Sequence, residues 1–265
     1  MQSKGNKKLW IILAVIFGVI LLVSATTLFF MLKARNTDFD KYKNPAATTA
    51  ADTTEVPATT EEETEAPLPE NPIDWEKLKG ENPDIYAWIT VDGTKIDYPI
   101  VQSHTDDSFY LRRDYLGNYS VSGCIFTQSM NALTFTDPNT LVYGHYMYDG
   151  TFFGGLHNFR NPEFFNENRH ITVCIEGHVL TYEIFAAYEY DNRHILLSFD
   201  FSDREVFEQY LSDCKNPQTL SRNVKEDVEL NGDSRIITLS TCLQNSDLSK
   251  RYLVQGVLIK DELTK

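Results

Sequence analysis

The feature that most constrains the fold is an uncharged, largely apolar run from residue 9 to residue 32. At about 1.5 Å per residue, a helix of this length can cross the ~30 Å hydrocarbon core of a bilayer. Three lysines precede the run, and Lys33 and Arg35 follow it. The run therefore predicts a transmembrane helix, and the rest of the chain must fold outside the lipid.

A cleaved signal peptide is the alternative interpretation of this run. Its apolar region would normally be about 7–15 residues long and end at a site of small residues. Ser24-Ala25-Thr26 offers a weak site of this kind, but the apolar run continues through Leu28 to Leu32. We therefore expect an uncleaved anchor with residues 1–8 as a short basic cytoplasmic tail. The N-terminus would lie inside and the bulk of the chain outside.

Composition divides the remainder of the chain into two parts. Residues 33–72 are rich in Thr, Ala, Glu and Pro and have no apolar periodicity, which is typical of a disordered extracellular stalk. Residues 73–265 have the composition of one globular domain. The formal net charge of −14 would repel a phosphate backbone, so nucleic acid is not an expected partner.

The globular part is dominated by short β patterns. Asp92-Gly93 and Glu176-Gly177 each separate two apolar runs, which predicts hairpins. Strands are expected at residues 85–91, 94–101, 123–127, 140–145, 170–175, 178–188, 236–242 and 251–259. Helices are expected at 73–79, within 152–168, and at 203–214 with Ser202 as N-cap. This pattern predicts a mainly β fold, a closed barrel of seven or eight strands with peripheral helices.

The strand at 236–242 ends in a cysteine. Alternation places Ser240 and Cys242 on one face of this strand and Thr241 on the other. If the strand pairs with 251–259 as a hairpin, Cys242 and Arg251 flank the mouth of the connecting loop. A thiol beside a guanidinium is a plausible nucleophile, although a strand cysteine is more often a small buried hydrophobic residue.

One histidine stands at a similar position. His145 ends the apolar strand 140–145, as Cys242 ends its own, so two barrel strands that end at the same rim would bring imidazole and thiol together. A buried, hydrogen-bonded histidine is the alternative. The other five histidines have polar or turn-like neighbours and are expected to be solvated surface residues: His104, His157, His170, His178 and His194.

The remaining cysteines, Cys124, Cys174 and Cys214, fit small buried residues. The chain contains no CxxC motif, so we expect no metal site. A disulfide among these three cysteines stays open, whereas a bridge through Cys242 would block the proposed chemistry.

Two motifs resemble those of sortases, the cysteine transpeptidases that attach proteins to the Gram-positive cell wall. They are Thr238-Leu239-Ser240-Thr241-Cys242, followed by Arg251, and Tyr143-Gly144-His145. Five further segments and the helix at 203–214 resemble class B sortases in particular. Those segments are residues 73–75, 82–84, 87–89, 96–102 and 123–126.

The resemblance implies a sortase-like β-barrel as catalytic domain (73–265), on the extracellular face of the cell membrane. Cys242 would attack the carbonyl of a Thr in the C-terminal sorting signal of a secreted protein, and an amine of a peptidoglycan precursor would then accept the acyl group. Arg251 would hold the substrate and stabilise the oxyanion, and His145 would act as general acid. Ser240 and Thr241 are candidate substrate contacts, and no metal or organic cofactor is required.

Two other functions remain open from the sequence. A hydrolytic cysteine peptidase would use the same thiol, but papain-like enzymes place the cysteine before the histidine, and here His145 precedes Cys242. A non-catalytic, membrane-anchored β-barrel binding module would simply bury Cys242.

Overall fold

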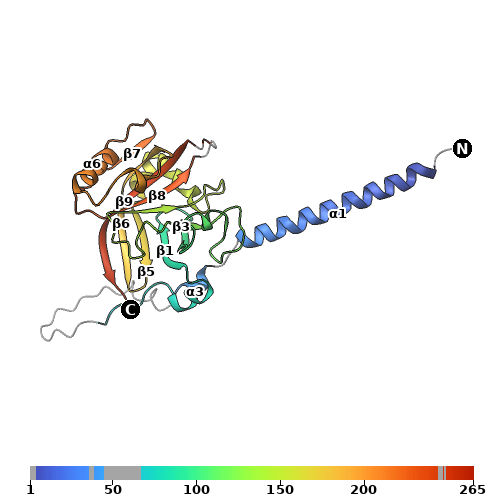
Figure 1. The fold of residues 1–265 in the computed structure, drawn as a ribbon, viewed down its shortest axis with the longest axis horizontal. Helices are drawn as coiled ribbons and strands as arrows, with labels where there is room; N and C mark the ends of the chain where they lie inside the picture. Colours follow the sequence, from blue (N-terminus) through green and yellow to red (C-terminus); the bar gives the residue numbers. More distant parts are fainter. Residues whose placement is uncertain (1–3, 36–38, 45–66, 244–246, 248) are drawn as a thin grey trace. The chain divides into compact units, whose positions relative to one another are not determined.

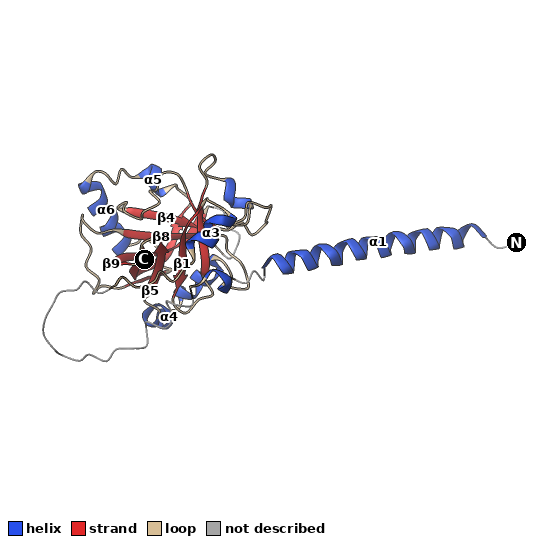
Figure 2. Cartoon of the chain, turned by 90° about the horizontal axis from the view of Figure 1, so that it is seen from below, coloured by secondary structure: helices blue, strands red, loops and turns tan. Residues whose placement is uncertain are grey.

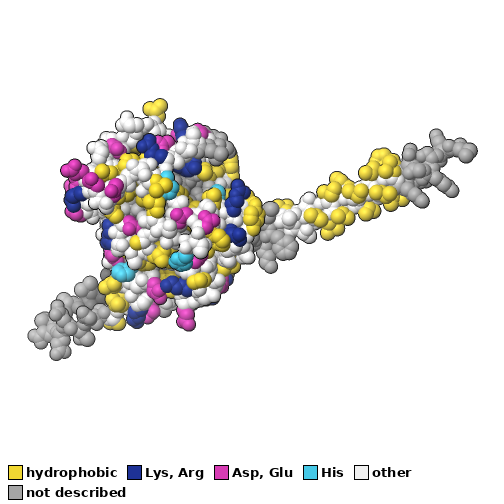
Figure 3. Space-filling view, viewed as in Figure 1, with side chains coloured by type: hydrophobic (Ala, Val, Ile, Leu, Met, Phe, Trp, Pro, Cys, Tyr) yellow, Lys and Arg dark blue, Asp and Glu magenta, His cyan; other side chains and the backbone are white. Residues whose placement is uncertain are grey.

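A computed structural model describes residues 4–35, 39–44, 67–243, 247 and 249–265. The chain divides into two compact units, Met1–Lys41 and Tyr42–Lys265. The first unit contains helix α1 (Lys4–Arg35), which includes the whole apolar run. Its segment Leu9–Leu28 is long and apolar enough to cross a membrane, and Figure 3 shows apolar side chains exposed along the helix.

Eight strands of the second unit form a closed barrel (Figure 1 and Figure 2). Neighbouring strands follow the order β5-β1-β2-β3-β4-β8-β9-β6, and the pairing of β5 with β6 closes the ring. The strands are β1 (Ile85–Val91), β2 (Asp97–Gln102), β3 (Ile125–Thr127), β4 (Asn139–Tyr143), β5 (His170–Ile175), β6 (His178–Asp191), β8 (Ile236–Cys242) and β9 (Lys250–Leu263). This arrangement confirms the predicted closed barrel.

Both predicted hairpins are present, since β1 pairs antiparallel with β2 and β5 with β6. Their turn glycines, Gly93 and Gly177, have positive φ angles of 68° and 84°, the conformation that a residue without Cβ adopts at little cost. The short strand β7 (Arg222–Val224) was not predicted. It pairs with the edge of β6 outside the ring, and its three residues carry no apolar alternation.

The pairing of β4 with β8 matters most for the site. The two strands run parallel, with Leu141 aligned with Thr238 and Tyr143 with Ser240. Parallel neighbours in register end at the same edge of a sheet. The C-terminal ends of β4 and β8 therefore lie side by side, although almost 100 residues separate them in the chain.

Side chains of β8 alternate between two hydrophobic clusters. Ile237 and Leu239 belong to the inner cluster, which they share with Ile89 of β1 and Tyr252 of β9. Ile236 belongs to the outer cluster, between the barrel and helix α6 (Arg204–Lys215). Because both faces are covered, the strand is an almost unbroken apolar run in the sequence.

Short helices surround the barrel: α3 (Trp75–Glu81), η2 (Phe109–Arg112), η3 (Phe153–Arg160), α4 (Pro162–Glu167), α5 (Ile195–Ser198) and α6. The single helical segment expected within 152–168 is thus two helices, interrupted at Asn161, whose side chain caps α4. The N-cap of α6 is Asp203 and not Ser202. Its side chain accepts hydrogen bonds from the N–H groups of Glu205 and Val206.

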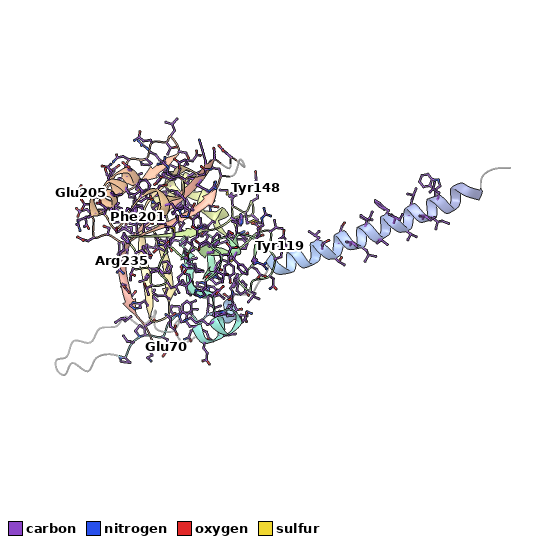
Figure 4. All side chains as sticks on the ribbon, viewed as in Figure 1. Glu70, Tyr119, Tyr148, Phe201, Glu205 and Arg235 are labelled. Carbon is purple, nitrogen blue, oxygen red and sulfur yellow. The ribbon has the colours of Figure 1, made fainter. Side chains whose placement is uncertain are left out.

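Helix α6 covers the outer cluster with one aromatic face. Phe201, labelled in Figure 4, packs against Phe207 and Tyr210 with ring centroids 5.4 and 4.8 Å apart. Glu205 lies on the exposed side of the same helix. This amphipathic pattern is the one that the sequence predicted for residues 203–214.

The segment around Tyr42 differs from the predicted disordered stalk. Tyr42 is fully buried, its ring centroid lies 6.3 Å from that of Trp88, and its hydroxyl hydrogen-bonds to Glu81. Lys43 forms an antiparallel bridge with Ile73. Tyr42 and Lys43 therefore belong to the globular unit, while residues 45–66 of the predicted stalk lie outside the described residues.

Candidate active site

Cys242 is the last residue of β8 and lies directly opposite Arg251, the second residue of β9. Directly opposed residues of an antiparallel pair project to the same face of the sheet. Alternation places Cys242 and Arg251 on the outer face, because Ile236 and Leu253, at even spacing from them, belong to the outer cluster. The thiol is half-buried and is not part of a disulfide.

His145 reaches the same place from β4. The β4–β8 register aligns Tyr143 with Ser240, and Gly144 donates its N–H to the Ser240 carbonyl at 3.2 Å. The aligned pairs end at Tyr143 and Ser240, so His145 lies two residues beyond the end of β4, next to the C-terminal end of β8. Of the three predicted catalytic residues, Cys242 ends β8, Arg251 lies at the start of the neighbouring β9, and His145 follows the end of the neighbouring β4.

A close contact fixes the ring of His145. Its Nε2 donates a hydrogen bond to the carbonyl of Leu111 at 2.7 Å, so Nδ1 is the nitrogen available for proton transfer. Gly123 makes room for this ring. It has a φ of +56°, and a Cβ added there would lie 2.9 Å from Cδ2 of His145 and 2.7 Å from the Leu111 oxygen.

The Tyr143 hydroxyl is influenced by burial and by two charged residues. Burial raises the pKa of the Tyr143 hydroxyl, Arg251 acts to lower this pKa, and Asp107 acts to raise it. Arg251 also donates from Nη1 to the carbonyl of Lys250 at 2.8 Å.

One wall of the site is aromatic and polar. Tyr143 stacks on Phe126 with ring centroids 5.4 Å apart, and its hydroxyl lies 3.5 Å from Nε2 of His194. The same nitrogen lies 2.6 Å from Oε1 of Gln128. His194 is half-buried and belongs to this wall, whereas the sequence suggested a solvated surface histidine.

The family model for the sortase domain matches residues 89–259, well over half of the chain. The chain belongs to the sortase family. Sortase B of Listeria monocytogenes is 37% identical over 181 residues, which cover 67% of this chain and 71% of that protein. Sortase B of Staphylococcus aureus is 29% identical over 187 residues, covering 70% and 75%.

Solved structures agree with these relatives. The X-ray structure of Clostridium perfringens sortase B matches with a TM-score of 0.63 and 36% identity, over 70% of this chain and 99% of that chain. The substrate complex of Staphylococcus aureus sortase B has a TM-score of 0.63 and 29% identity, over 71% and 85%. The protein is thus a cysteine transpeptidase of cell-wall sorting, and its resemblance to class B sortases is confirmed.

The other cysteines of this sortase are buried, as the sequence predicted, and none forms a disulfide in the structure. Desolvation raises the pKa of the thiol in all three, to about 12 for Cys174, to about 11 for Cys214 and well above its usual value for Cys124. A buried thiol with a raised pKa is a poor nucleophile at neutral pH. Cys242 is the one half-buried cysteine.

The two predicted substrate contacts, Ser240 and Thr241, are 5% and 2% exposed. Ser240 shares the outer face with Cys242, whereas alternation directs Thr241 to the opposite face. We therefore retain Ser240 as the candidate substrate contact. Within the described residues, no group of three or more His, Cys, Asp and Glu side chains could hold a metal ion.

His157 is the residue of this site that the sequence interpretation missed. It lies in η3, half-buried, and its Nε2 is 3.0 Å from the backbone oxygen of Cys242. Its ring packs against Tyr146 and Tyr252, with centroids 4.7 and 5.0 Å away. The one sequence signal is its position between Leu156 and Phe159, two residues that are fully buried.

Proposed function

We propose that this sortase cleaves the C-terminal sorting signal of secreted proteins after Thr and joins the acyl group to an amine of a peptidoglycan precursor or cross-bridge. Cys242 is the nucleophile, His145 the general acid and Arg251 the residue that stabilises the oxyanion. The observation that carries the proposal is the strand register, in which the C-terminal ends of β4 and β8 are neighbours and Cys242 lies opposite Arg251 at the start of β9.

In the first step, the Sγ of Cys242, as thiolate, forms a bond to the carbonyl carbon of the Thr. The carbonyl oxygen gains the negative charge, and Arg251, opposite Cys242 across the β8–β9 pair, donates hydrogen bonds to it. The C–N bond then breaks. The leaving nitrogen needs a proton, and a positioned imidazolium can supply it.

The contact of His145 decides which nitrogen performs that transfer. Nε2–H is engaged by the carbonyl of Leu111, so the proton for the leaving amine is carried by Nδ1 of the imidazolium. In the second step, the acceptor amine attacks the thioester and gives a proton back to Nδ1. The Cys242 thiolate leaves, and a new amide has formed without a net change in charge.

The membrane anchor fits this substrate pair. Helix α1 is long enough to hold the enzyme in the cell membrane, with the N-terminus inside and the barrel on the extracellular face. Secreted proteins with sorting signals and lipid-linked cell-wall precursors both reach that face. Tethering would therefore raise the local concentration of both substrates.

The proposal is tested with the full-length chain in detergent, incubated with a peptide carrying a sorting signal and with an excess of a short amine acceptor. Mass spectrometry of the products is expected to show a peptide joined to the acceptor through the Thr. Release of the free acid alone, even with acceptor present, would instead indicate a hydrolytic peptidase. No cleavage of a panel of sorting peptides would favour the binding module.

Cys242→Ala is expected to abolish both products. The matched control is Cys174→Ala, which removes a thiol buried elsewhere in the barrel and should leave transfer unchanged. An active Cys242→Ala enzyme would contradict the assignment of the nucleophile.

A further inference from the structure

His157 contacts the backbone of the proposed nucleophile, Cys242. A carbonyl oxygen can only accept, so Nε2–H of His157 donates to the oxygen of Cys242 over 3.0 Å. Tyr146 and Tyr252 hold the imidazole from two sides, with interplanar angles of 63° and 30°. Ring rotation is thus restricted by packing on both sides.

The hydrogen bond from His157 to the Cys242 oxygen lies just beyond the last aligned pair of β4 and β8. Gly144 N–H donates to the Ser240 oxygen, and the next acceptor in a parallel ladder would be the oxygen of Cys242, two residues on. Its regular donor would be Tyr146 N–H. The aligned pairs of β4 and β8 end at Tyr143, however, and Tyr146 instead forms a bridge with Phe152. The imidazole of His157 therefore provides the donor to this carbonyl.

The two sides of the sheet explain how this contact leaves the thiol accessible. Cys242 and Arg251 project to the outer face, whereas Tyr252, the partner of His157, belongs to the inner cluster. His157 thus approaches the Cys242 carbonyl from the side of the inner cluster, next to Tyr252.

We propose that His157 is a positioning residue for catalysis, which fixes the peptide plane after Cys242 and thereby aims the thiol at His145 and Arg251. The inference rests on Cys242 being the nucleophile. On the side of β4, the described residues provide no other hydrogen bond to this carbonyl, because the ladder with β4 ends before Cys242, whereas β9 pairs with Cys242 on the other side. A loosely held peptide plane would let the Cα–Cβ bond swing, and small displacements of a nucleophile cost much of the advantage of orientation.

The charge state of His157 agrees with this role. Burial lowers its pKa to about 4, against a smaller opposing effect of the bond to Cys242. The imidazole is therefore neutral at pH 7, with its one proton on Nε2. A neutral donor holds the carbonyl without placing a second positive charge beside Arg160, whose Cζ lies 5.1 Å from the centroid of the Tyr252 ring.

Two kinds of substitution separate positioning from simple packing. His157→Phe keeps an aromatic ring between Tyr146 and Tyr252 but cannot donate, whereas His157→Gln loses the ring but keeps an amide donor at similar reach. In the full-length enzyme, we expect kcat of transfer to fall about 10-fold in His157→Phe, with KM changed less than twofold. His157→Gln is expected to recover kcat to within about threefold of the unsubstituted enzyme.

A second readout follows the thiol without substrate. The rate of carbamidomethylation of Cys242 by iodoacetamide, followed by mass spectrometry, is expected to change in His157→Phe and to return in His157→Gln. His170→Phe, which replaces a half-buried histidine of β5 that contacts Asp92, is the control and should alter neither readout. His157→Leu is a second variant without a donor, for use if the Phe variant does not fold.

The outcomes distinguish this inference from the proposed function. Full kcat in a folded His157→Phe or His157→Leu enzyme, together with an inactive Cys242→Ala enzyme, would overturn the role of His157 and keep that of Cys242. Equal loss of kcat in His157→Gln and His157→Phe would also overturn it, since packing would then account for the loss. Activity of Cys242→Ala would overturn both.

Discussion

Cys242 and Arg251 are directly opposed across the antiparallel β8–β9 pair, at the point where β8 ends. Because two paired strands of one barrel hold both backbones, the Cα of Arg251 has a fixed position relative to the Cα of Cys242. Side chains on rigid elements are held more accurately than side chains on loops. With Cys242 as the proposed nucleophile, we expect the oxyanion to develop within reach of the same arginine.

The first prediction concerns Arg251. Arg251→Lys keeps the positive charge but loses the planar fork of donors, so we expect kcat/KM of transfer to fall about 100-fold. Steady-state kinetics with the sorting peptide would measure it. Lys250→Ala, which removes the neighbouring cation, is the control and should stay within about threefold of the unsubstituted enzyme. Comparable losses of kcat/KM in the two variants would argue for a general effect of positive charge near Cys242 and against a specific role of Arg251.

The second prediction concerns Gly123, which leaves space for the ring of His145. In Gly123→Ala, the new Cβ would lie 2.9 Å from Cδ2 of His145 and 2.7 Å from the Leu111 oxygen, at a φ of +56°. We expect at least a ~10-fold loss of kcat, since the ring must move, and a loss of about 1–2 kcal/mol in the free energy of unfolding.

Gly177→Ala separates these two effects. Gly177 has a similarly positive φ of 84°, but nothing lies within 4 Å of an added Cβ. The Gly177→Ala enzyme should lose about as much stability as the Gly123→Ala enzyme and keep its transferase activity. A Gly123→Ala enzyme with normal kcat would show that His145 tolerates displacement.

The sequence was sufficient for most of the barrel, and the roles of the three catalytic candidates stay predictions. Period-two patterns and turn glycines are local, so β1, β5 and β8 were predicted with the bounds that the structure has. Strand β7 was missed because three polar residues paired at an edge carry no such pattern. The parallel pairing of β4 with β8 joins segments that are distant in sequence, and local patterns do not contain it. The sequence predicted only that the two strands would end at the same rim.

His157 and Tyr42 show what local patterns do not contain. The imidazole of His157 is half-buried by Tyr146 and Tyr252, which come from other segments, so the residues next to it in sequence did not reveal its contacts. Tyr42 is surrounded in sequence by polar and charged residues, yet it is fully buried against Trp88 and Tyr115. In both cases, the partners that bury the side chain are set by tertiary structure.

The third prediction is a dependence of stability on pH that arises from His157. Burial lowers its pKa from 6.5 to about 4, so between these values the unfolded chain binds a proton that the folded chain does not. The contribution to stability is complete above pH 6.5 and is lost as the pH falls toward 4. Because the ring is only partly buried, we expect a loss of about 1–2 kcal/mol in the free energy of unfolding.

Urea unfolding at pH 7 and at pH 4.5 would measure this loss, with His157→Gln as the reference that does not titrate. The charged groups that face His157 are Arg160 of η3 and Glu189 of β6, which pair at 3.0 Å and are present in both proteins. Subtracting the two pH dependences therefore isolates the imidazole. An identical pH dependence in both proteins would contradict the lowered pKa.

The fourth prediction concerns Tyr42, whose ring fills a site formed by Trp88 and Tyr115 although the sequence assigned it to the stalk. Truncation to Ala would leave a cavity at a fully buried position, so we expect Tyr42→Ala to lower the free energy of unfolding of the barrel by about 3–4 kcal/mol. Tyr42→Phe keeps the ring and loses the bonds to Glu81 and Tyr115, for an expected cost of about 1 kcal/mol. Tyr119→Ala, at a side chain that is 71% exposed, is the matched control and should cost less than about 0.5 kcal/mol. Equal stability of the Tyr42→Ala and Tyr119→Ala proteins in urea unfolding would return Tyr42 to the stalk, since a buried aromatic ring cannot be removed without a measurable loss.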